Sequence, residues 1–314
     1  MRNNRLIILA PCYNEEEIIE YSIEQLTSLL DGMIEEGLIS GDSKVCFVND
    51  GSRDRTSNLI KQHCLTNKKI ALINLTRNYG QQSALLAGLN IVDADMVVTI
   101  DADLQDNHLV IKDMVKKYQE GYEVVYGCRK KRDTDSFLKK NTALLFYKFM
   151  NLIGIDIIQN HSEFRLLSRE AIEKLKEYKE KTIFLRGVVS YLGLKSAEVY
   201  YDRLERIAGQ TKYSYLKLME LAWTAITSFS MLPLRLITVI GALTSFVSIL
   251  ILFYGIISYV KHYSTPGWTS IIMTIAFFSG IIIMSLGIIG EYLSKVLLEV
   301  KNRPLYQIEE ILNL

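Results

Sequence analysis

Two aspartates at the end of a short apolar run have the spacing of a metal and diphosphate site. Asp101 and Asp103 follow residues 97–100, which have the pattern of a strand. Carboxylates at positions i and i+2, where a strand opens into a loop, can turn toward one Mg²⁺ or Mn²⁺ that also binds substrate phosphates. Gln105 could add a carbonyl oxygen. An aspartate-rich turn that caps a helix after Asp106 is the alternative, since Asp is common at helix N-caps.

Further polar residues follow the other apolar runs. Asp50 comes after the run 45–48, where its carboxylate could accept the ring N–H of a pyrimidine base. A turn and a helix cap account for the nearby Asp54 but do not require Asp50. After the first apolar run, Tyr13 offers a ring for stacking and Glu15 offers a carboxylate for a ribose or a base. A strand end followed by a helix start would use the same two residues.

Alternating strand and helix patterns must position these residues. Runs rich in β-branched residues predict strands at 5–10, 45–48, 70–75, 96–100 and 124–126, with helices at 15–30, 55–64 and 81–91. Such alternation indicates an α/β fold of Rossmann type, with a mostly parallel sheet and helices on both faces. In these sheets ligands bind beyond the carboxyl ends of the strands, and the polar residues are expected there.

Charge and hydropathy divide the chain in two. Its 314 residues carry 36 basic and 35 acidic side chains. This balance gives no overall positive charge that would favour binding to a polyanion, and no nucleic acid is expected as a partner. The mean hydropathy of +0.14 is high for a chain with 23% charged residues. Residues 212–314 hold only 7 basic and 5 acidic side chains. A polar, globular part therefore precedes an apolar part. The four cysteines lack metal-site spacing and are expected to be free thiols.

Two stretches near the C-terminus are long enough to cross a bilayer. Residues 236–260 and 262–290 contain no Asp, Glu, Lys or Arg, and about 20 apolar residues suffice for a membrane-spanning helix. Basic residues flank the pair on both sides, whereas the connecting loop has only Lys261 and His262. The positive-inside rule then places both termini in the cytoplasm. Apolar residues at helical spacing within 215–230 predict an amphipathic helix at the membrane surface.

These residues together form the motifs of a known family. Four motifs resemble, in order and spacing, those of family 2 glycosyltransferases with the GT-A fold: Pro11-x-Tyr-Asn-Glu15, Asn49-Asp50-Gly-Ser-x-Asp54-x-Thr56, Arg77-Asn-Tyr-Gly80-Gln and Asp101-Ala-Asp-Leu-Gln-Asp106. Further motifs narrow the resemblance to one branch of this family: Gly127-x-Arg129, Phe164-Arg-Leu166, Arg203-x-x-Arg206-x-x-Gly209-x-x-Lys212-Tyr213 and Arg303-Pro304-x-Tyr306. The whole chain resembles the polyprenyl-phosphate glycosyltransferases, the bactoprenol glucosyltransferase-like branch related to dolichol-phosphate mannose synthase.

This resemblance implies an inverting transfer of a hexose from a UDP-sugar donor to a polyprenyl phosphate acceptor, undecaprenyl phosphate, with Mg²⁺ or Mn²⁺ as cofactor. By motif match, the nucleotide-sugar would be bound by Pro11, Tyr13, Glu15, Asp50, Arg77, Asp101 and Ala102, and the metal by Asp101, Asp103 and Gln105. The lipid phosphate would be bound by Arg129, Arg132, Arg206 and Lys212. The last two could equally be juxtamembrane charges that attract anionic lipid headgroups.

One position departs from the family pattern. Before Phe164 the family usually carries an Asp proposed to act as a base or to orient the acceptor, and this chain has Glu163. Glu163 joins Asp101 and Asp103 as a predicted catalytic residue, and its role as base or as positioning group is left open. A phosphate monoester has a second pKa near 6, so the acceptor is already largely ionised at neutral pH. Positioning and neutralisation of the UDP leaving group should therefore dominate catalysis.

The resemblance also predicts the organisation and partners of the protein. The expected parts are a cytoplasmic GT-A domain at 1–210, amphipathic juxtamembrane helices at 211–234, two transmembrane helices at 235–293 and a cytoplasmic tail at 294–314. The protein would lie in the bacterial plasma membrane as a multi-pass homo-oligomer, with a tetramer suspected. It would contact membrane lipid, and a downstream flippase would move its product toward cell-envelope glycosylation.

Two other functions compete with this one. A processive polysaccharide synthase shares the nucleotide-sugar motifs but usually carries Gln-x-x-Arg-Trp and more membrane helices, and neither Trp223 nor Trp268 follows an Arg. A catalytically silent membrane scaffold is the second alternative, because a fold alone does not imply activity. The intact pair Asp101 and Asp103 argues against it. The motifs are common to enzymes for different sugars, so the identity of the hexose is left open.

Overall fold

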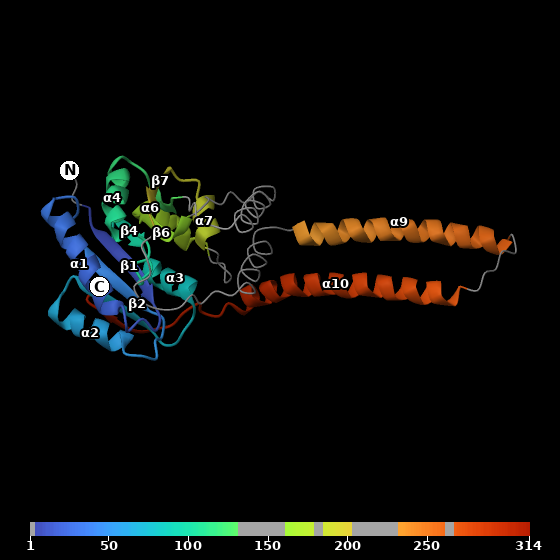
Figure 1. Ribbon diagram of the computed structural model, residues 1–314, viewed down its shortest axis with the longest axis horizontal. Helices are drawn as coiled ribbons and strands as arrows, with labels where there is room; N and C mark the ends of the chain where they lie inside the picture. Colours follow the sequence, from blue (N-terminus) through green and yellow to red (C-terminus); the bar gives the residue numbers. More distant parts are fainter. Residues whose placement is uncertain (1–3, 131–160, 179–184, 203–231, 261–266) are drawn as a thin grey trace. The chain divides into compact units, whose positions relative to one another are not determined.

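The chain folds into two compact units (Figure 1). The computed structural model describes residues 4–130, 161–178, 185–202, 232–260 and 267–314. One unit comprises Met1–Lys212 together with Pro304–Leu314, and the other comprises Tyr213–Arg303. Of the expected cytoplasmic tail, 294–314, residues 304–314 belong to the same unit as the sheet, and residues 294–303 belong to the other unit. The amphipathic helix predicted within 215–230 lies outside the described residues.

The first unit is built on an eight-stranded sheet in the order β7-β5-β6-β4-β1-β2-β3-β8. The strands are β1 (Leu6–Cys12), β2 (Lys44–Asn49), β3 (Ile70–Leu75), β4 (Met96–Thr99), β5 (Val124–Arg129), β6 (His161–Ser168), β7 (Ser196–Tyr201) and β8 (Ile308–Leu312). β1 is parallel to β2 and β4, β2 to β3, and β5 to β7. β6 and β8 are antiparallel to their neighbours. The predicted α/β fold with a mostly parallel sheet is confirmed.

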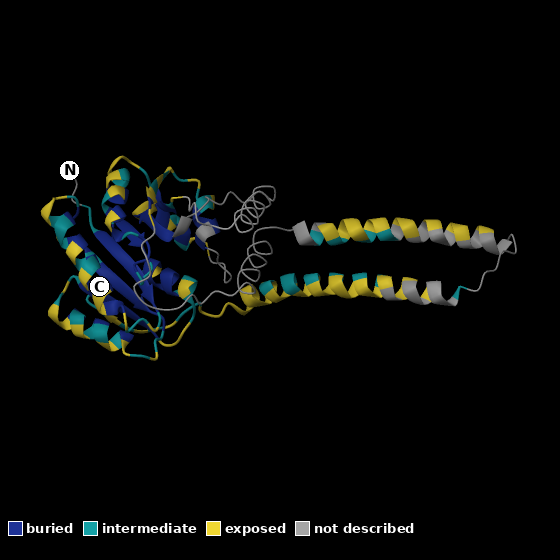
Figure 2. Cartoon of the chain, in the orientation of Figure 1, coloured by how far each residue is buried: buried dark blue, intermediate teal, exposed yellow. Residues whose placement is uncertain are grey.

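Helices cover both faces of this sheet (Figure 2). They are α1 (Ile19–Glu35), α2 (Thr56–Thr66), α3 (Gln81–Ile91), the short 3₁₀ helix η1 (His108–Val110), α4 (Ile111–Gln119), α6 (Arg169–Lys176) and α7 (Leu185–Tyr191). Successive side chains of a strand point to opposite faces. In β1, Ile8 therefore joins the core formed with α1, α2 and α4, whereas Leu9 packs against Gly88 of α3. With both faces covered, β1 is buried along its whole length, which explains its continuous apolar sequence.

The C-terminal strand β8 was not predicted from the sequence. It lies at the edge of the sheet, antiparallel to β3. Asn313 fixes its end, because its side-chain amide donates to the carbonyl oxygens of Cys64 and Ile70 at 2.6 and 3.1 Å. Lys61 and Glu310 add an ion pair at 2.6 Å between α2 and β8. These contacts join segments that are more than 200 residues apart in sequence, which local patterns do not reveal.

The second unit contains two long helices, α9 (Leu232–Val260) and α10 (Trp268–Lys301). At about 1.5 Å per residue, each is longer than the roughly 30 Å hydrocarbon core of a bilayer. Large apolar side chains on both helices are exposed, among them Leu243 (60%), Phe253 (59%) and Ile283 (70%). Among the described residues, one segment, Phe277–Lys301, is long and apolar enough to cross a membrane by length and composition. The pair of transmembrane helices stays a prediction.

Gly51 marks a tight approach between two loops of the first unit. Its φ of +63° lies in the left-handed region, and a Cβ at this position would stand 2.2 Å from the carbonyl carbon of Arg77. Gly37, at the end of α1, has a similar φ of +70° but nothing within 4 Å of an added Cβ. The two glycines therefore differ in steric contact and not in backbone strain.

We predict that Gly51→Ala destabilises the protein much more than Gly37→Ala. Strain alone should cost Gly37→Ala about 1 kcal/mol, whereas the backbone clash should raise the loss in Gly51→Ala to roughly 3 kcal/mol. Thermal unfolding followed by circular dichroism measures both. Equal melting temperatures of the two variants would contradict the close contact between Gly51 and Arg77.

Candidate active site

The loops after β1, β2, β3 and β4 meet at one edge of the sheet. Cys12, the last residue of β1, pairs with Asn49, the last residue of β2, and Asn49 pairs with Asn74 of β3. Thr99 ends β4, and Asp101 follows it by two residues. Parallel strands in register end together. The structure therefore brings residues 13–15, Asp50, Arg77 and 101–103 to the same edge, where the sequence predicted a site.

The loop after β4 holds Asp101 and Asp103 in a fixed backbone. The carbonyl oxygen of Ala102, a residue that is only 3% exposed, accepts the Ser22 hydroxyl at 2.5 Å. Leu104 turns the chain with a φ of +47°. Asp103 Oδ1 accepts the backbone N–H of Gln105 at 3.2 Å, and Asp101 Oδ1 accepts the side-chain amide of Gln81 at 2.6 Å. Both carboxylates belong to a loop anchored to α1 and α3.

These two carboxylates have the donor chemistry of a divalent-cation site that a substrate completes. Both side chains are partly exposed, and carboxylate oxygens with phosphates and water form the usual ligand set of Mg²⁺ or Mn²⁺. The described residues contain no group of three or more His, Cys, Asp or Glu side chains that could hold a metal. A pair of carboxylates fits a Mg²⁺ or Mn²⁺ ion that takes its other ligands from substrate phosphates and water. Gln105 is only 4% exposed, and its ligand role stays a prediction.

Asp50 is buried and holds the loop that follows β3. Its two carboxylate oxygens accept the backbone N–H groups of Tyr79 and Gly80, at 2.7 and 2.8 Å. Burial raises the pKa of Asp50, and the two N–H groups offset only part of that rise. A carboxylate held with a perturbed pKa at the carboxyl edge of a sheet is typical of a functional site. The structure therefore assigns Asp50 a part in shaping residues 76–80, beside its predicted contact with a base.

Side-chain hydrogen bonds fasten the loop after β1 to the loop after β2. The backbone N–H of Asn14, whose φ is +53°, donates to Ser52 Oγ at 2.9 Å, and the N–H of Glu15 donates to Thr56 Oγ1 at 2.9 Å. Of the nucleotide contacts predicted here, Tyr13 and Glu15 are partly exposed, and Pro11 is buried within β1. Tyr13 and Glu15 can thus meet a ligand with their side chains.

Arg77 borders an open pocket of about 390 Å³. Its guanidinium carbon lies 4.5 Å from the centroid of the Tyr79 ring, a cation–π contact that orders an otherwise exposed side chain. The pocket is lined by the ends of β2 and β3, by the loops after them and by Glu309 of β8. Its volume lies within the range of about 300–1,000 Å³ that is usual for small-molecule sites.

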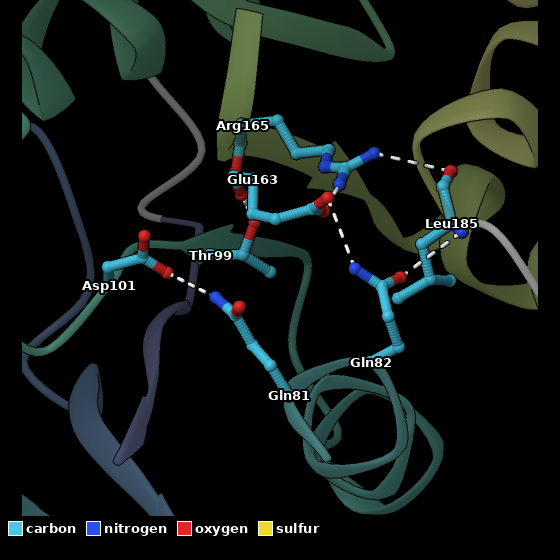
Figure 3. Close-up of polar contacts among 7 residues, drawn as sticks. All are labelled: Gln81, Gln82, Thr99, Asp101, Glu163, Arg165 and Leu185. Carbon is cyan, nitrogen blue, oxygen red and sulfur yellow. Dashed lines mark hydrogen bonds and ion pairs between the residues drawn. The ribbon is translucent and has the colours of Figure 1, made fainter. Parts of the chain in front are cut away.

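Glu163 lies in β6 within a buried polar cluster (Figure 3). Its carboxylate forms an ion pair with Arg165, and the two side chains are 8% and 2% exposed. The Thr99 hydroxyl of β4 donates to the backbone carbonyl of Glu163. The side-chain amide of Gln82 donates to Glu163 Oε1 at 3.2 Å, and Arg165 donates to the carbonyl oxygen of Leu185 at 3.3 Å. Buried charges are stable when paired and hydrogen-bonded, and this cluster meets that condition.

Arg129, predicted to bind the lipid phosphate, pairs with Asp106. Its Nε and Nη2 atoms lie 3.0 and 2.9 Å from Asp106 Oδ1, and the Asp106 side chain is only 2% exposed. A third of the Arg129 side chain remains exposed. Asn107, rather than Asp106, caps η1 by accepting the N–H of Leu109. A helix does follow Asp106, as the helix-cap alternative expected, but the side chain that caps it is that of an asparagine. The other three predicted phosphate contacts, Arg132, Arg206 and Lys212, lie outside the described residues.

Sequence reasoning missed Gln81, Gln82 and Arg165 as parts of this site. Gln81 and Gln82 occupy the first two positions of α3, directly after Gly80. In the sequence, Arg165 belongs to the Phe164-Arg-Leu166 motif, which by itself indicates no partner for it. An arginine two residues from a glutamate in a strand places both side chains on the same face of the sheet. That spacing was the available signal for the buried pair.

The comparisons with known proteins agree with this arrangement. The sequence matches glycosyl transferase family 2 over residues 7–176, more than half of the chain. The uncharacterized glycosyltransferase YkoT of Bacillus subtilis is 47% identical over 306 residues, covering 97% of this chain and 91% of that protein. The SfII prophage-derived bactoprenol glucosyl transferase of Shigella flexneri is 36% identical and covers 98% of each chain. The prophage bactoprenol glucosyl transferase homolog of Escherichia coli is also 36% identical, covering 98% of this chain and 99% of that protein. The chain therefore belongs to glycosyltransferase family 2.

Proposed function

We propose that this glycosyltransferase moves a hexose from a UDP-sugar to a polyprenyl phosphate at a membrane surface. The observation that carries the proposal is the placement of two different carboxylate groups at one edge of the sheet. Asp101 and Asp103 form a partly exposed pair, and Glu163 is buried against Arg165. The pair Asp101 and Asp103 would bind a metal and the donor diphosphate. Glu163 would lie on the side of the site where the acceptor phosphate binds. The relatives named bactoprenol glucosyl transferase support the lipid acceptor.

The donor would lie across the loops after β1, β2 and β3. Tyr13 would stack on the base, and Asp50 and Glu15 would accept hydrogen bonds from the base and the ribose. Arg77, which already lies over the Tyr79 ring, would neutralise nucleotide charge. Asp101 and Asp103 would hold Mg²⁺ or Mn²⁺, which when bound supplies positive charge to the departing diphosphate.

The reaction requires no strong general base. An ionised oxygen of the lipid phosphate attacks the anomeric carbon, the bond from that carbon to the diphosphate oxygen breaks, and UDP leaves with the bonding electron pair. The sugar carbon is inverted. A phosphate monoester with a second pKa near 6 has already lost the relevant proton at neutral pH. The protein's residues then have to align the oxygen with the carbon and to exclude competing water.

Glu163 fits a positioning role better than that of a base. Its charge is already compensated by Arg165, and both side chains are almost fully buried. A bare carboxylate would repel an incoming phosphate, whereas a paired one contributes little net charge. Arg129, whose charge is likewise paired, with Asp106, is a third exposed and would donate hydrogen bonds to that phosphate. The net positive charge would come from Arg132, Arg206 and Lys212.

The two long helices would anchor the protein where its lipid substrate lies. We infer that α9 and α10 both span the membrane, because each exceeds the thickness of the hydrocarbon core and exposes large apolar side chains. The basic residues on both outer flanks would keep the sheet-containing unit and both termini in the cytoplasm. A homo-oligomer in the bacterial plasma membrane and a flippase that moves the product onward belong to the same proposal.

The proposal predicts donor cleavage that depends on the lipid phosphate. Purified full-length protein with Mg²⁺ or Mn²⁺ should release UDP from at least one UDP-hexose when undecaprenyl phosphate is present. Omission of the lipid or addition of a chelator should reduce UDP release to background. A coupled assay for UDP across a panel of UDP-sugars measures this. The proposal fails if no UDP-sugar in the panel is turned over under these conditions.

A second prediction concerns the carboxylate pair. Asp103→Ala should lower kcat/KM by at least about 100-fold, because an electrostatic contact to a developing charge is typically worth that much. Its melting temperature should stay close to that of the wild type, because Asp103 is partly exposed. Asp113→Ala in α4, where Asp113 forms an exposed ion pair with Lys116, is the matched control and should retain activity. Full activity of Asp103→Ala would show that Asp103 does not contribute to metal or diphosphate binding in the site.

A third prediction separates the two roles of Glu163. Glu163→Gln should lower kcat only about tenfold, since loss of a true general base costs about 100- to 10,000-fold. Glu163→Leu should destabilise the protein by about 3–5 kcal/mol, because it leaves Arg165 buried without its partner. Steady-state kinetics of the first variant and thermal unfolding of the second test this. A 1,000-fold loss in Glu163→Gln would identify Glu163 as the base instead.

A further inference from the structure

Two consecutive glutamines at the start of α3 reach the two carboxylate groups of the site (Figure 3). Gln81 donates to Asp101 Oδ1 at 2.6 Å, and Gln82 donates to Glu163 Oε1 at 3.2 Å. Consecutive side chains on a helix point about 100° apart, so neighbouring residues can serve different partners. One helix end therefore contacts both the donor side and the acceptor side of the site.

Both ends of the Gln82 amide are engaged, which defines its orientation. The side-chain oxygen of Gln82 accepts the backbone N–H of Leu185 at 3.2 Å. Since that N–H can only donate, the NH₂ group of Gln82 must face Glu163. Arg165 donates to the carbonyl oxygen of the same Leu185. The four residues form a closed ring of contacts that joins α3, β6 and α7.

Within this ring, each oxygen of Glu163 has its own donor. Arg165 binds Oε2, and Gln82 binds Oε1. The ion pair alone leaves the carboxylate able to rotate about the bond that joins it to the side chain, whereas a second donor on the other oxygen fixes its plane. Glu163 is 7% exposed, so water offers little substitute for the Gln82 amide.

We propose that Gln82 is a positioning residue, which fixes the Glu163 carboxylate for the acceptor phosphate without touching a substrate itself. This inference deepens the proposed function and rests on it. Because Gln81 contacts Asp101 from the adjacent position, the start of α3 also sets the spacing between the donor-side and acceptor-side carboxylates. A change at Gln82 should therefore alter the rate of transfer while donor binding is preserved.

Gln82→Glu is the informative substitution, because it removes one of the two contacts of Gln82 and keeps the other. An ionised carboxylate can still accept the Leu185 N–H, but it has no hydrogen to donate to Glu163 and repels the Glu163 carboxylate. We expect kcat for transfer to undecaprenyl phosphate to fall about tenfold, with KM for the UDP-sugar changed less than twofold. Gln62→Glu on the exposed surface of α2 introduces the same charge and should leave both constants unchanged. Wild-type kcat in Gln82→Glu would overturn the inference, because a residue needed only to hold Leu185 would survive this change.

The double variant Gln82→Glu with Glu163→Gln tests the contact itself. Donor and acceptor then exchange places, so the hydrogen bond can form again in the opposite direction. We expect a melting temperature above that of Gln82→Glu alone and a kcat no lower than that of Glu163→Gln alone. Additive losses in both measurements, with an active wild type, would overturn this inference and leave the proposed function standing. An inactive wild type would overturn the proposed function, and this inference with it.

Discussion

The buried ion pair between Glu163 and Arg165 is the interaction on which the arrangement of the site depends. It lies in β6, the antiparallel strand between β4 and β5. Hydrogen bonds with Thr99, Gln82 and Leu185 connect the two residues to β4, α3 and α7. Removal of either partner would leave a buried charge, at a cost of about 3–5 kcal/mol. The pair therefore holds this part of the sheet edge, the proposed acceptor side, in a fixed relation to the loop of Asp101.

Desolvated carboxylates recur along this edge with different partners. Asp50 is paired with backbone N–H groups, Glu163 with an arginine and an amide, and Asp106 with Arg129. Asp101 and Asp103, in contrast, are two partly exposed carboxylates on one loop. This difference separates groups that shape the site from groups that can meet a cation and a diphosphate. Tertiary contacts, rather than residue type, set the role of each aspartate or glutamate.

The central part of the fold could be predicted because it is encoded locally. The apolar patterns of β1 and α3 can each be recognised within a short stretch of sequence. The helix α3 occupies the predicted range 81–91. The loops after the first four strands were located for the same reason. β8, with its alternating pattern of five residues, is an edge strand that is stabilised by pairing with β3, which is far away in sequence. The glutamines of α3 contact carboxylates that lie on β6 and in the loop after β4. Because these contacts form only in the folded sheet, no local sequence pattern predicts them.

In the proposed reaction, a lipid phosphate oxygen attacks the anomeric carbon of a UDP-hexose directly. The configuration and connectivity of the product show whether this attack takes place. After incubation with undecaprenyl phosphate and the active UDP-sugar, the lipid product can be purified and its anomeric proton and phosphorus resonances measured by NMR. We expect a sugar joined through C1 to the lipid phosphate, with its configuration inverted relative to the donor. A product with retained configuration, or release of free sugar alone, would contradict it.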